Sequence, residues 1–246
     1  MSTKALRNFR PDLHYTPKSG WINDPNGLVY AGGKYHLFAQ YGPEPQWGDI
    51  HWSHAVSSDL IHWQDLPLAL APDSLGMVFS GSAVYDNGNT SGLGTGGRAP
   101  IVAMYTSHGC HEQQSLAVSQ DGVSFTKYPG NPVIPNREKP DFRDPKVLRN
   151  PGGGWTVVLA AGDHVEFYAS KDLISWRQTG SFGPGGNLSK GVWECPDLFP
   201  LTLGGREVWV LIVSMGACPE NLGSRTQYFL GNFDGETFTS DGSFTK

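Results

Sequence analysis

Four segments of this 246-residue chain share one pattern, and this repeat constrains the fold more than any other feature of the sequence. In each segment an aspartate is followed four residues later by an aromatic residue, and successive aspartates are 62, 51 and 62 residues apart. Each aspartate follows a run of residues typical of a β-strand, so we expect its side chain to close a hairpin turn. The four pairs are Asp59 with Trp63, Asp121 with Phe125, Asp172 with Trp176, and Asp234 with Phe238.

A hairpin that recurs at this interval predicts an all-β propeller built from blades of four strands each. The composition agrees, because 32 Gly, 18 Pro and 12% aromatic residues favour short strands and turns over a helical bundle. The alternative is chance similarity, since Ser-x-Asp-Gly sequences are common in loops. We interpret residues 1–246 as a single propeller domain in which four blades are visible.

An apolar-flanked polar stretch precedes each hairpin. The four stretches read WINDPNG, FSGSAV, FRDPKV and WECPDLF, and they begin at residues 21, 79, 142 and 193. In a propeller the first strand of every blade lines the central channel. We therefore expect Asp24, Asp144 and Glu194 to meet in one funnel although they are far apart in the sequence.

Carboxyl groups that converge in one pocket suit a particular chemistry. Their charges repel, so one group can stay ionised while another holds a proton near neutral pH. Glycoside hydrolysis requires such a pair, with one carboxylate as nucleophile or base and one carboxylic acid for the leaving oxygen. Plainer interpretations remain open: Asp24 closes a turn, Asp144 pairs with Arg143, and Glu194 forms a structural ion pair.

Three of the polar stretches also resemble a known family. WINDPNG, FRDP and WECPD, in that order, are similar to the three signatures of glycoside hydrolase family 32, which contains invertases, inulinases, levanases and fructosyltransferases. The resemblance extends from about Arg10 over nearly the whole chain and includes HLFAQY and QYFLGNFDGETF. The Gly-rich segments match no phosphate-binding loop.

The resemblance implies roles for individual residues. Asp24 would be the nucleophile, Glu194 the general acid/base, and Asp144 the residue that binds ring hydroxyls and stabilises the transition state. A retaining mechanism further implies that the carboxyl groups of Asp24 and Glu194 lie ~5 Å apart. The residues implied to bind the terminal fructosyl unit are Asn23, Gln40, Trp47, Phe79, Ser80 and Arg143. Of these, Gln40 and Ser80 have an ordinary alternative as hydrogen-bonding strand residues.

The chain departs from the family pattern in its blade number. The family usually has five blades and a C-terminal β-sandwich, whereas four repeats and no sandwich are visible here. A fragment, a four-bladed ring and a ring completed by a partner chain all fit this observation, and we expect residues 1–20 to add at most one strand to the last blade. An open ring would expose strand edges, which predicts possible self-association.

Charge and composition exclude other classes of protein. The net charge of −5 and the lack of a basic face make nucleic acid an improbable partner. We find no membrane-spanning run and no signal peptide, so we expect a cytoplasmic protein, with a secreted mature form left open. Three widely spaced cysteines argue against a disulfide framework. His and Cys spacings match no zinc site, and the chemistry needs no metal or cofactor.

The sequence thus predicts a retaining β-fructofuranosidase that acts on sucrose, inulin or levan. The exo-acting inulinases and levanases are the subgroup that it resembles most. A fructosyltransferase would use the same three carboxyl groups, and product analysis would distinguish it. A carbohydrate-binding fragment without turnover is a third reading, and a glycosidase for arabinose polymers is a fourth.

Overall fold

The computed structural model describes residue 11, residues 13–185 and residues 190–244, and these form an all-β fold. They contain sixteen strands and one short 3-10 helix, η1 (Pro219–Asn221). The strands are β1 (Trp21–Ala31), β2 (Lys34–Gly42), β3 (His51–Ser57), β4 (Trp63–Leu70), β5 (Met77–Tyr85), β6 (Ile101–His108), β7 (Glu112–Ser119), β8 (Thr126–Lys127), β9 (Phe142–Arg149), β10 (Trp155–Ala161), β11 (Val165–Ser170), β12 (Arg177–Phe182), β13 (Trp193–Leu203), β14 (Arg206–Cys218), β15 (Gly223–Phe233) and β16 (Phe238–Phe244).

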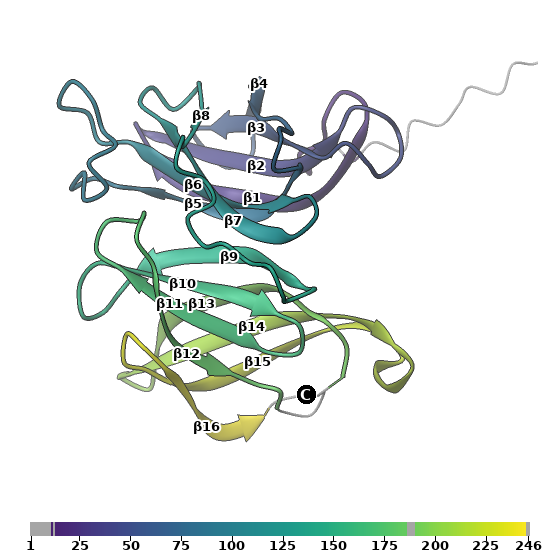
Figure 1. The fold of residues 1–246 in the computed structure, drawn as a ribbon, viewed down its shortest axis with the longest axis vertical. Coiled ribbons are helices and arrows are strands. Elements are labelled where there is room, and N and C mark those ends of the chain that lie inside the picture. The colour runs from purple at the N-terminus through teal and green to yellow at the C-terminus, as the bar shows by residue number, and fades with distance from the viewer. Residues whose placement is uncertain (1–10, 12, 186–189, 245–246) are drawn as a thin grey trace, which may run out of the picture.

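The strands form four antiparallel sheets of four strands each, in chain order (Figure 1). We call them blade 1 (β1 to β4), blade 2 (β5 to β8), blade 3 (β9 to β12) and blade 4 (β13 to β16). The first strands of successive blades contact one another, β1 with β5, β5 with β9 and β9 with β13. The predicted propeller arrangement with four blades, and with the first strand of each blade innermost, is therefore confirmed.

The repeated aspartates close the hairpins as predicted. Asp59 Oδ1 accepts hydrogen bonds from the backbone N–H groups of Ile61 and His62, at 2.9 and 2.8 Å. Asp121, Asp172 and Asp234 make the same two bonds in the other blades. All four turns join the third strand of a blade to its fourth, which explains why the sequence spacing is nearly regular.

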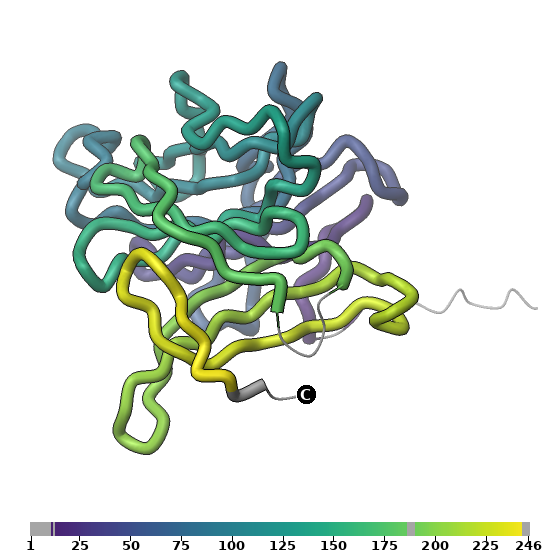
Figure 2. Tube along the Cα trace, turned by 60° about the horizontal axis from the view of Figure 1, so that its bottom comes forward, coloured from purple at the N-terminus to yellow at the C-terminus, as the bar shows by residue number. Residues whose placement is uncertain are grey.

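Apolar side chains are buried between neighbouring blades. One core cluster joins blades 1 and 2 around Trp52 and Tyr105, a second joins blades 2 and 3 around Trp155, and a third joins blades 3 and 4 around Trp193 and Phe229. In Figure 2 the C-terminal hairpin lies alongside blade 3, where Glu236 accepts a hydrogen bond from Arg177. The blades are therefore held together face to face.

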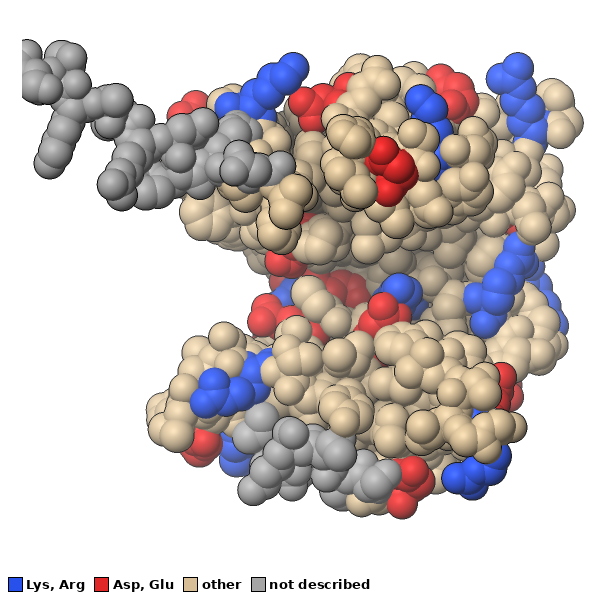
Figure 3. Space-filling model, turned by 180° about the vertical axis from the view of Figure 1, so that it is seen from behind, with Lys and Arg blue, Asp and Glu red and all other residues tan. Residues whose placement is uncertain are grey.

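The two halves of the molecule enclose a hollow. Figure 3 shows it between the half with blades 1 and 2 and the half with blades 3 and 4, and acidic side chains gather inside it. The inner strands of the first and last blades also carry apolar side chains that are more than half exposed: Leu28, Tyr30, Leu201 and Leu203.

The described part of the N-terminal segment lies beside blade 1. Residues 13–20 form no strand, and they do not extend blade 4. The Tyr15 hydroxyl instead donates to Asp65 of blade 1 at 3.0 Å, and its ring packs edge-on against Trp63. The segment follows blade 1 because its one large aromatic residue finds an aromatic and a carboxylate partner there. The expectation for residues 1–10 falls outside the described residues.

Candidate active site

All four inner strands lose their regular pairing at the polar stretches. The register of β1 shifts between Ile22 and Pro25, and that of β5 shifts between Val78 and Gly81. The β9–β10 register shifts next to Arg143, and that of β13 shifts between Glu194 and Asp197. Such bulges re-aim side chains out of the regular pleat.

The sequence explains why the bulges fall at these points. A proline follows Asp24, Asp144 and Cys195 directly, and proline has no N–H for the strand ladder. Asp144 and Cys195 also adopt positive φ angles of 61° and 47°. Non-glycine residues rarely adopt this conformation, which is typical of functional sites. The bulges turn the carboxyl groups toward the centre of the propeller.

A chain of hydrogen bonds leads to Asp24. Trp21 Nε1 donates to Asn23 Oδ1 at 2.9 Å, and Asn23 Nδ2 donates to Gln40 Oε1 at 2.9 Å. Gln40 Nε2 donates to Ser80 Oγ at 2.5 Å, and the Ser80 hydroxyl donates to Asp24 Oδ2 at 2.6 Å. Every donor points the same way, so the chain of hydrogen bonds ends on a carboxylate oxygen and holds the Asp24 side chain in place.

Asp144 is enclosed by the neighbouring blades. Its side chain is 7% exposed, and its Oδ2 accepts the backbone N–H of Cys195 at 2.9 Å. Burial raises its pKa to about 6, and the charges of Asp24 and Glu194 add to that rise, although the Cys195 N–H and Arg143 oppose it. This carboxyl group therefore loses its proton at a higher pH than an ordinary aspartate does.

The Cys195 thiol connects two of the carboxyl groups. Its Sγ lies 3.6 Å from Asp144 Oδ2 and 3.8 Å from Asp24 Oδ2. The residue is exposed toward the hollow, yet protein atoms surround its sulfur closely enough to keep the thiol protonated. This desolvation, together with the charges of Asp144, Asp24 and Glu194, raises the pKa of the thiol. Cys195 is therefore a neutral donor and not a nucleophile.

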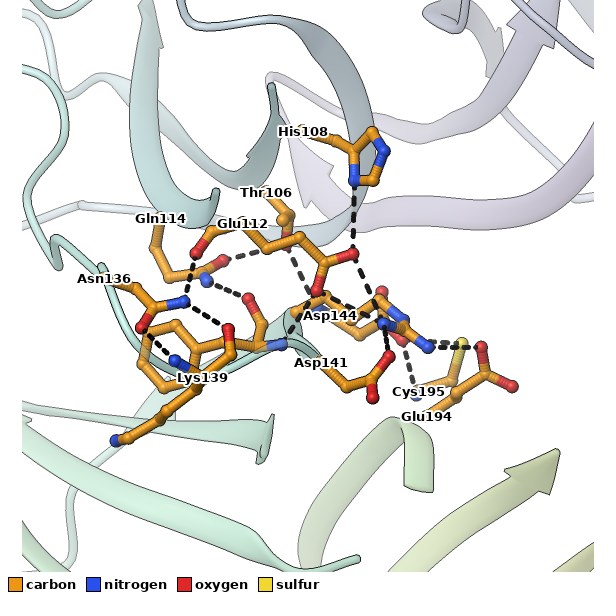
Figure 4. A network of polar contacts seen from close by, with 12 residues as sticks. Thr106, His108, Glu112, Gln114, Asn136, Lys139, Asp141, Asp144, Glu194 and Cys195 are labelled. Atoms are coloured by element: carbon orange, nitrogen blue, oxygen red, sulfur yellow. Dashed lines mark hydrogen bonds and ion pairs between the residues drawn. The ribbon is translucent and has the colours of Figure 1, made fainter. Parts of the chain in front are cut away.

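Glu194 is more open than Asp144, with a side chain that is 39% exposed. Its Oε1 accepts a hydrogen bond from Arg143 Nη2 at 3.1 Å (Figure 4). Nη1 of the same guanidinium pairs with Asp141 at 2.7 Å. Arg143 thus pairs with Glu194 and Asp141, and the ion pairs among the described residues include none between Arg143 and Asp144. It links β9 of blade 3 to the carboxyl group on β13 of blade 4.

Aromatic side chains lie beside the polar groups. Phe79 stacks on the imidazole ring of His108 with ring centroids 4.0 Å apart and an interplanar angle of 7°. Trp47, in the loop between β2 and β3, meets Phe79 edge-on at 6.0 Å and is 53% exposed. An exposed indole offers a flat apolar surface to the face of a sugar ring.

A cavity of about 180 Å³ lies between the four inner strands. Its walls include Ser80, Asp144 and Cys195, so the inner strands converge around one space as predicted. A larger cavity of about 700 Å³ lies between blades 1 and 2, next to the last residue of β1, Ala31. Its lining includes none of the candidate site residues, which lie near the first residues of β1.

The structure brings the predicted site residues into three groups. Asn23, Gln40, Ser80 and Asp24 form the hydrogen-bond chain, Arg143 meets Glu194, and Trp47 meets Phe79. Cys195, which contacts both Asp144 and Asp24, connects the third carboxyl group to the first of these groups. The sequence interpretation missed Glu112, Asp141 and His108. The sequence carries no clear signal for them beyond the polar segment from His108 to Glu112, whose pattern is typical of a loop.

Among the residues that the structure describes, no three His, Cys, Asp or Glu side chains are grouped to hold a metal ion. No helix in the described part of the chain has the length and apolar composition needed to span a membrane. All three cysteines are free thiols. The arrangement offers carboxyl groups, a guanidinium and hydrogen-bond donors, which are the groups for acid/base and nucleophilic chemistry on a glycoside.

Fold and site together define an all-β propeller domain with carboxyl groups at its centre. The model of the glycosyl hydrolases family 32 N-terminal domain matches residues 14–246, and the chain belongs to this family. It is 51% identical over 241 residues to a levanase of Bacillus subtilis, covering 95% of this chain and 36% of that protein. It is 43% identical over 268 residues to an extracellular exo-inulinase of Aspergillus niger, covering 95% of this chain and 50% of that protein.

Solved structures agree with this assignment. The exo-inulinase from Aspergillus awamori matches with a TM-score of 0.89 and 41% identity, covering 96% of this chain and 52% of that one. The β-fructofuranosidase from Schwanniomyces occidentalis, complexed with fructosyl-erythritol, matches with a TM-score of 0.88 and 36% identity, covering 96% and 49%. This chain thus spans about half of these proteins, and about a third of the levanase.

Proposed function

We propose that this chain carries the catalytic site of a retaining β-fructofuranosidase, which cleaves terminal β-D-fructofuranosyl units from sucrose or from fructans such as inulin and levan. The observation that carries the proposal is the meeting of three carboxyl groups from three blades. Cys195 contacts both Asp144 and Asp24, and Arg143 donates a hydrogen bond to Glu194. The levanase and exo-inulinase relatives support fructans as substrates.

The geometry suggests a role for each carboxyl group. Asp24 is the nucleophile: its lone pair attacks the anomeric carbon, C2, while the bond from C2 to the leaving oxygen breaks. The Ser80 hydroxyl, 2.6 Å from Asp24 Oδ2, holds the carboxylate in place for this attack. Glu194 gives its proton to the leaving oxygen and then takes one from the water that cleaves the fructosyl–Asp24 ester.

Asp144 suits a binding role better than a proton-transfer role. It is the most enclosed of the three carboxyl groups, and it is tied to the Cys195 backbone at 2.9 Å. A fixed carboxyl group at this position accepts hydrogen bonds from ring hydroxyls, and these bonds strengthen as positive charge develops on the sugar ring. The expected separation of ~5 Å between the Asp24 and Glu194 carboxyl groups stays a prediction.

The test is release of fructose from sucrose, inulin and levan by the purified chain and by two variants. Glu194→Gln removes the proposed acid/base group, whereas Glu207→Gln changes an exposed glutamate at the far end of blade 4. We expect the first variant to lose release and the second to keep it. Release that survives Glu194→Gln would contradict the proposal. Longer oligosaccharides at high sucrose would indicate transfer to sugar in place of water.

We further propose that the chain self-associates at high concentration. The exposed apolar residues on the innermost strands of blades 1 and 4, such as Leu28 and Leu201, support contact through sheet surfaces and not only through strand edges. Sedimentation velocity over a range of concentrations tests this. A sedimentation coefficient that does not change with concentration would contradict it.

A further inference from the structure

We propose that Glu112 is a positioning residue, which holds the guanidinium of Arg143 in the orientation that presents it to Glu194. The proposal rests on the function proposed above, because it concerns the same site. Glu112 is the first residue of β7 in blade 2, so it lies on the third strand of its blade and not on an inner strand. It is nevertheless 6% exposed and points into the polar network of Figure 4.

Glu112 contacts blade 3 at two points. Its Oε2 accepts the backbone N–H of Phe142 at 2.8 Å, and its two oxygens lie 3.3 and 3.2 Å from Arg143 Nη1. One carboxylate therefore fixes both the backbone just before Arg143 and one end of its side chain. This double contact restricts the rotamers that Arg143 can adopt.

One end of the guanidinium is held by carboxylates, and the other end donates to Glu194. Nη1 lies between Glu112 and Asp141, whereas Nη2 donates to Glu194 at 3.1 Å. Because the guanidinium is planar and rigid, fixing Nη1 also fixes the direction of Nη2. The Arg143 side chain is only 15% exposed, so few water molecules compete for these contacts.

Glu112 has a second role, which is to balance the positive charge of Arg143. Glu112 and Asp141 both face the guanidinium, so its positive charge is shared among carboxylates and does not act on Glu194 alone. Glu112 thus keeps the guanidinium oriented and keeps its charge balanced.

Glu112 also reaches the aromatic side of the site. Its Oε1 lies 3.2 Å from His108 Nδ1, and the His108 ring stacks on Phe79 at 4.0 Å. The same carboxylate therefore supports the surface next to Trp47 and the charged group next to Glu194. Through Glu112 and its partners His108 and Arg143, residues of blades 2, 3 and 4 are connected.

The chain offers a matched control for Glu112. Glu166, on β11 of blade 3, is 4% exposed and is also held by a cation and a ring nitrogen. Its partners are Lys139, at 2.7 Å, and the Tyr168 hydroxyl, at 2.6 Å. Replacing Glu166 by glutamine disturbs a buried carboxylate of the same kind without changing the partners of Arg143.

The experiment is a double-mutant cycle read by kcat/KM on sucrose, with Glu112→Gln, Arg143→Lys and the double variant, beside Glu166→Gln. Misplaced groups near the reaction cost up to ~100-fold, so we expect Glu112→Gln to lower kcat/KM roughly 10- to 100-fold. In the Arg143→Lys background the same change should cost less than about 3-fold, because its effect passes through the guanidinium. Glu166→Gln should lower the unfolding temperature without a comparable loss of rate.

Two outcomes would overturn the proposal. The first is a loss from Glu112→Gln that is as large in the Arg143→Lys background as in the unchanged chain. The second is a Glu112→Gln variant that is as active as Glu166→Gln. If Glu112→Gln does not fold, Glu112→Asp takes its place, since it keeps the charge and withdraws the carboxylate from Arg143.

A crystal structure of the Glu112→Gln variant separates this proposal from the function on which it rests. We expect Arg143 Nη2 to leave Glu194 whether or not the chain releases fructose. An unmoved guanidinium would contradict the positioning role. An unchanged chain that releases no fructose would contradict the proposed function, while the displacement of Arg143 would still support the role of Glu112.

Discussion

Replacing Asp144 with asparagine should stabilise the fold at alkaline pH while it weakens catalysis. Burial is the main reason that the pKa of Asp144 is raised from 3.8 to about 6, and the nearby charges of Asp24 and Glu194 contribute as well. Each unit of pKa corresponds to ~1.4 kcal/mol, so a shift of this size corresponds to about 3 kcal/mol of folding free energy. The fold bears this cost whenever Asp144 is ionised.

The sign of the effect follows from the direction of the shift. Because the pKa of Asp144 is higher in the folded state than in the unfolded chain, the folded state binds the proton more tightly. The contribution of Asp144 to stability is therefore greatest below the unfolded pKa of ~3.9, falls as the pH rises to about 6, and stays reduced above that. Asparagine cannot ionise, and its carbonyl oxygen can still accept the Cys195 N–H.

Urea denaturation of the unchanged chain and of Asp144→Asn, followed by circular dichroism, measures the difference. We expect the two chains to be equally stable near pH ~4, and the variant to be more stable by about 3 kcal/mol near pH ~8. Asp163→Asn, which alters an exposed carboxylate, is the matched control and should show no such divergence. A difference that does not change with pH, or a variant that is less stable at pH ~8, would refute the reasoning.

Three further predictions concern other parts of the chain. Asp86 is fully buried and accepts four hydrogen bonds, so Asp86→Asn should cost about 2 kcal/mol in urea denaturation at neutral pH. Because those bonds lower the pKa of Asp86 although burial opposes them, the difference should shrink as the pH falls below ~3.9. Iodoacetamide should alkylate exposed Cys110 well before Cys195, because burial raises the pKa of the Cys195 thiol and keeps it protonated. Peptide mass mapping measures the order in which the two thiols react. Faster reaction of Cys195 would contradict the desolvated environment assigned to its sulfur. Trp47→Ala should raise KM for sucrose about 2- to 10-fold with little change in kcat, and an unchanged KM would show that the indole does not contact the sugar.

Much of the fold was predictable because its signals are local. An aspartate such as Asp121 caps its own turn through the two N–H groups that follow it, so the hairpin can be read from a few residues. Once four hairpins indicated blades, the convergence of Asp24, Asp144 and Glu194 followed from the rule that the first strand of a blade lies innermost. The family resemblance supplied their roles.

The rest of the site depended on contacts that no short segment encodes. Glu112 comes from the third strand of blade 2, and only the packing of blade 2 against blade 3 brings it to Arg143. The approach of Cys195 to Asp24 likewise needs positive φ at Cys195 and the shift in β13 register. The position of residues 13–20 beside blade 1 could not be predicted, because Tyr15 is directed by its tertiary partners, Trp63 and Asp65.

The most direct test of the central claim is to look for the covalent intermediate on Asp24. The purified chain would be quenched rapidly with acid during turnover of sucrose, and its peptides mapped by mass spectrometry. The proposed double displacement predicts a hexosyl adduct on the peptide that contains Asp24, and no adduct in an Asp24→Asn variant. Fructose release without such an adduct, or an adduct on a different carboxyl group, would contradict the assignment of Asp24 as the nucleophile.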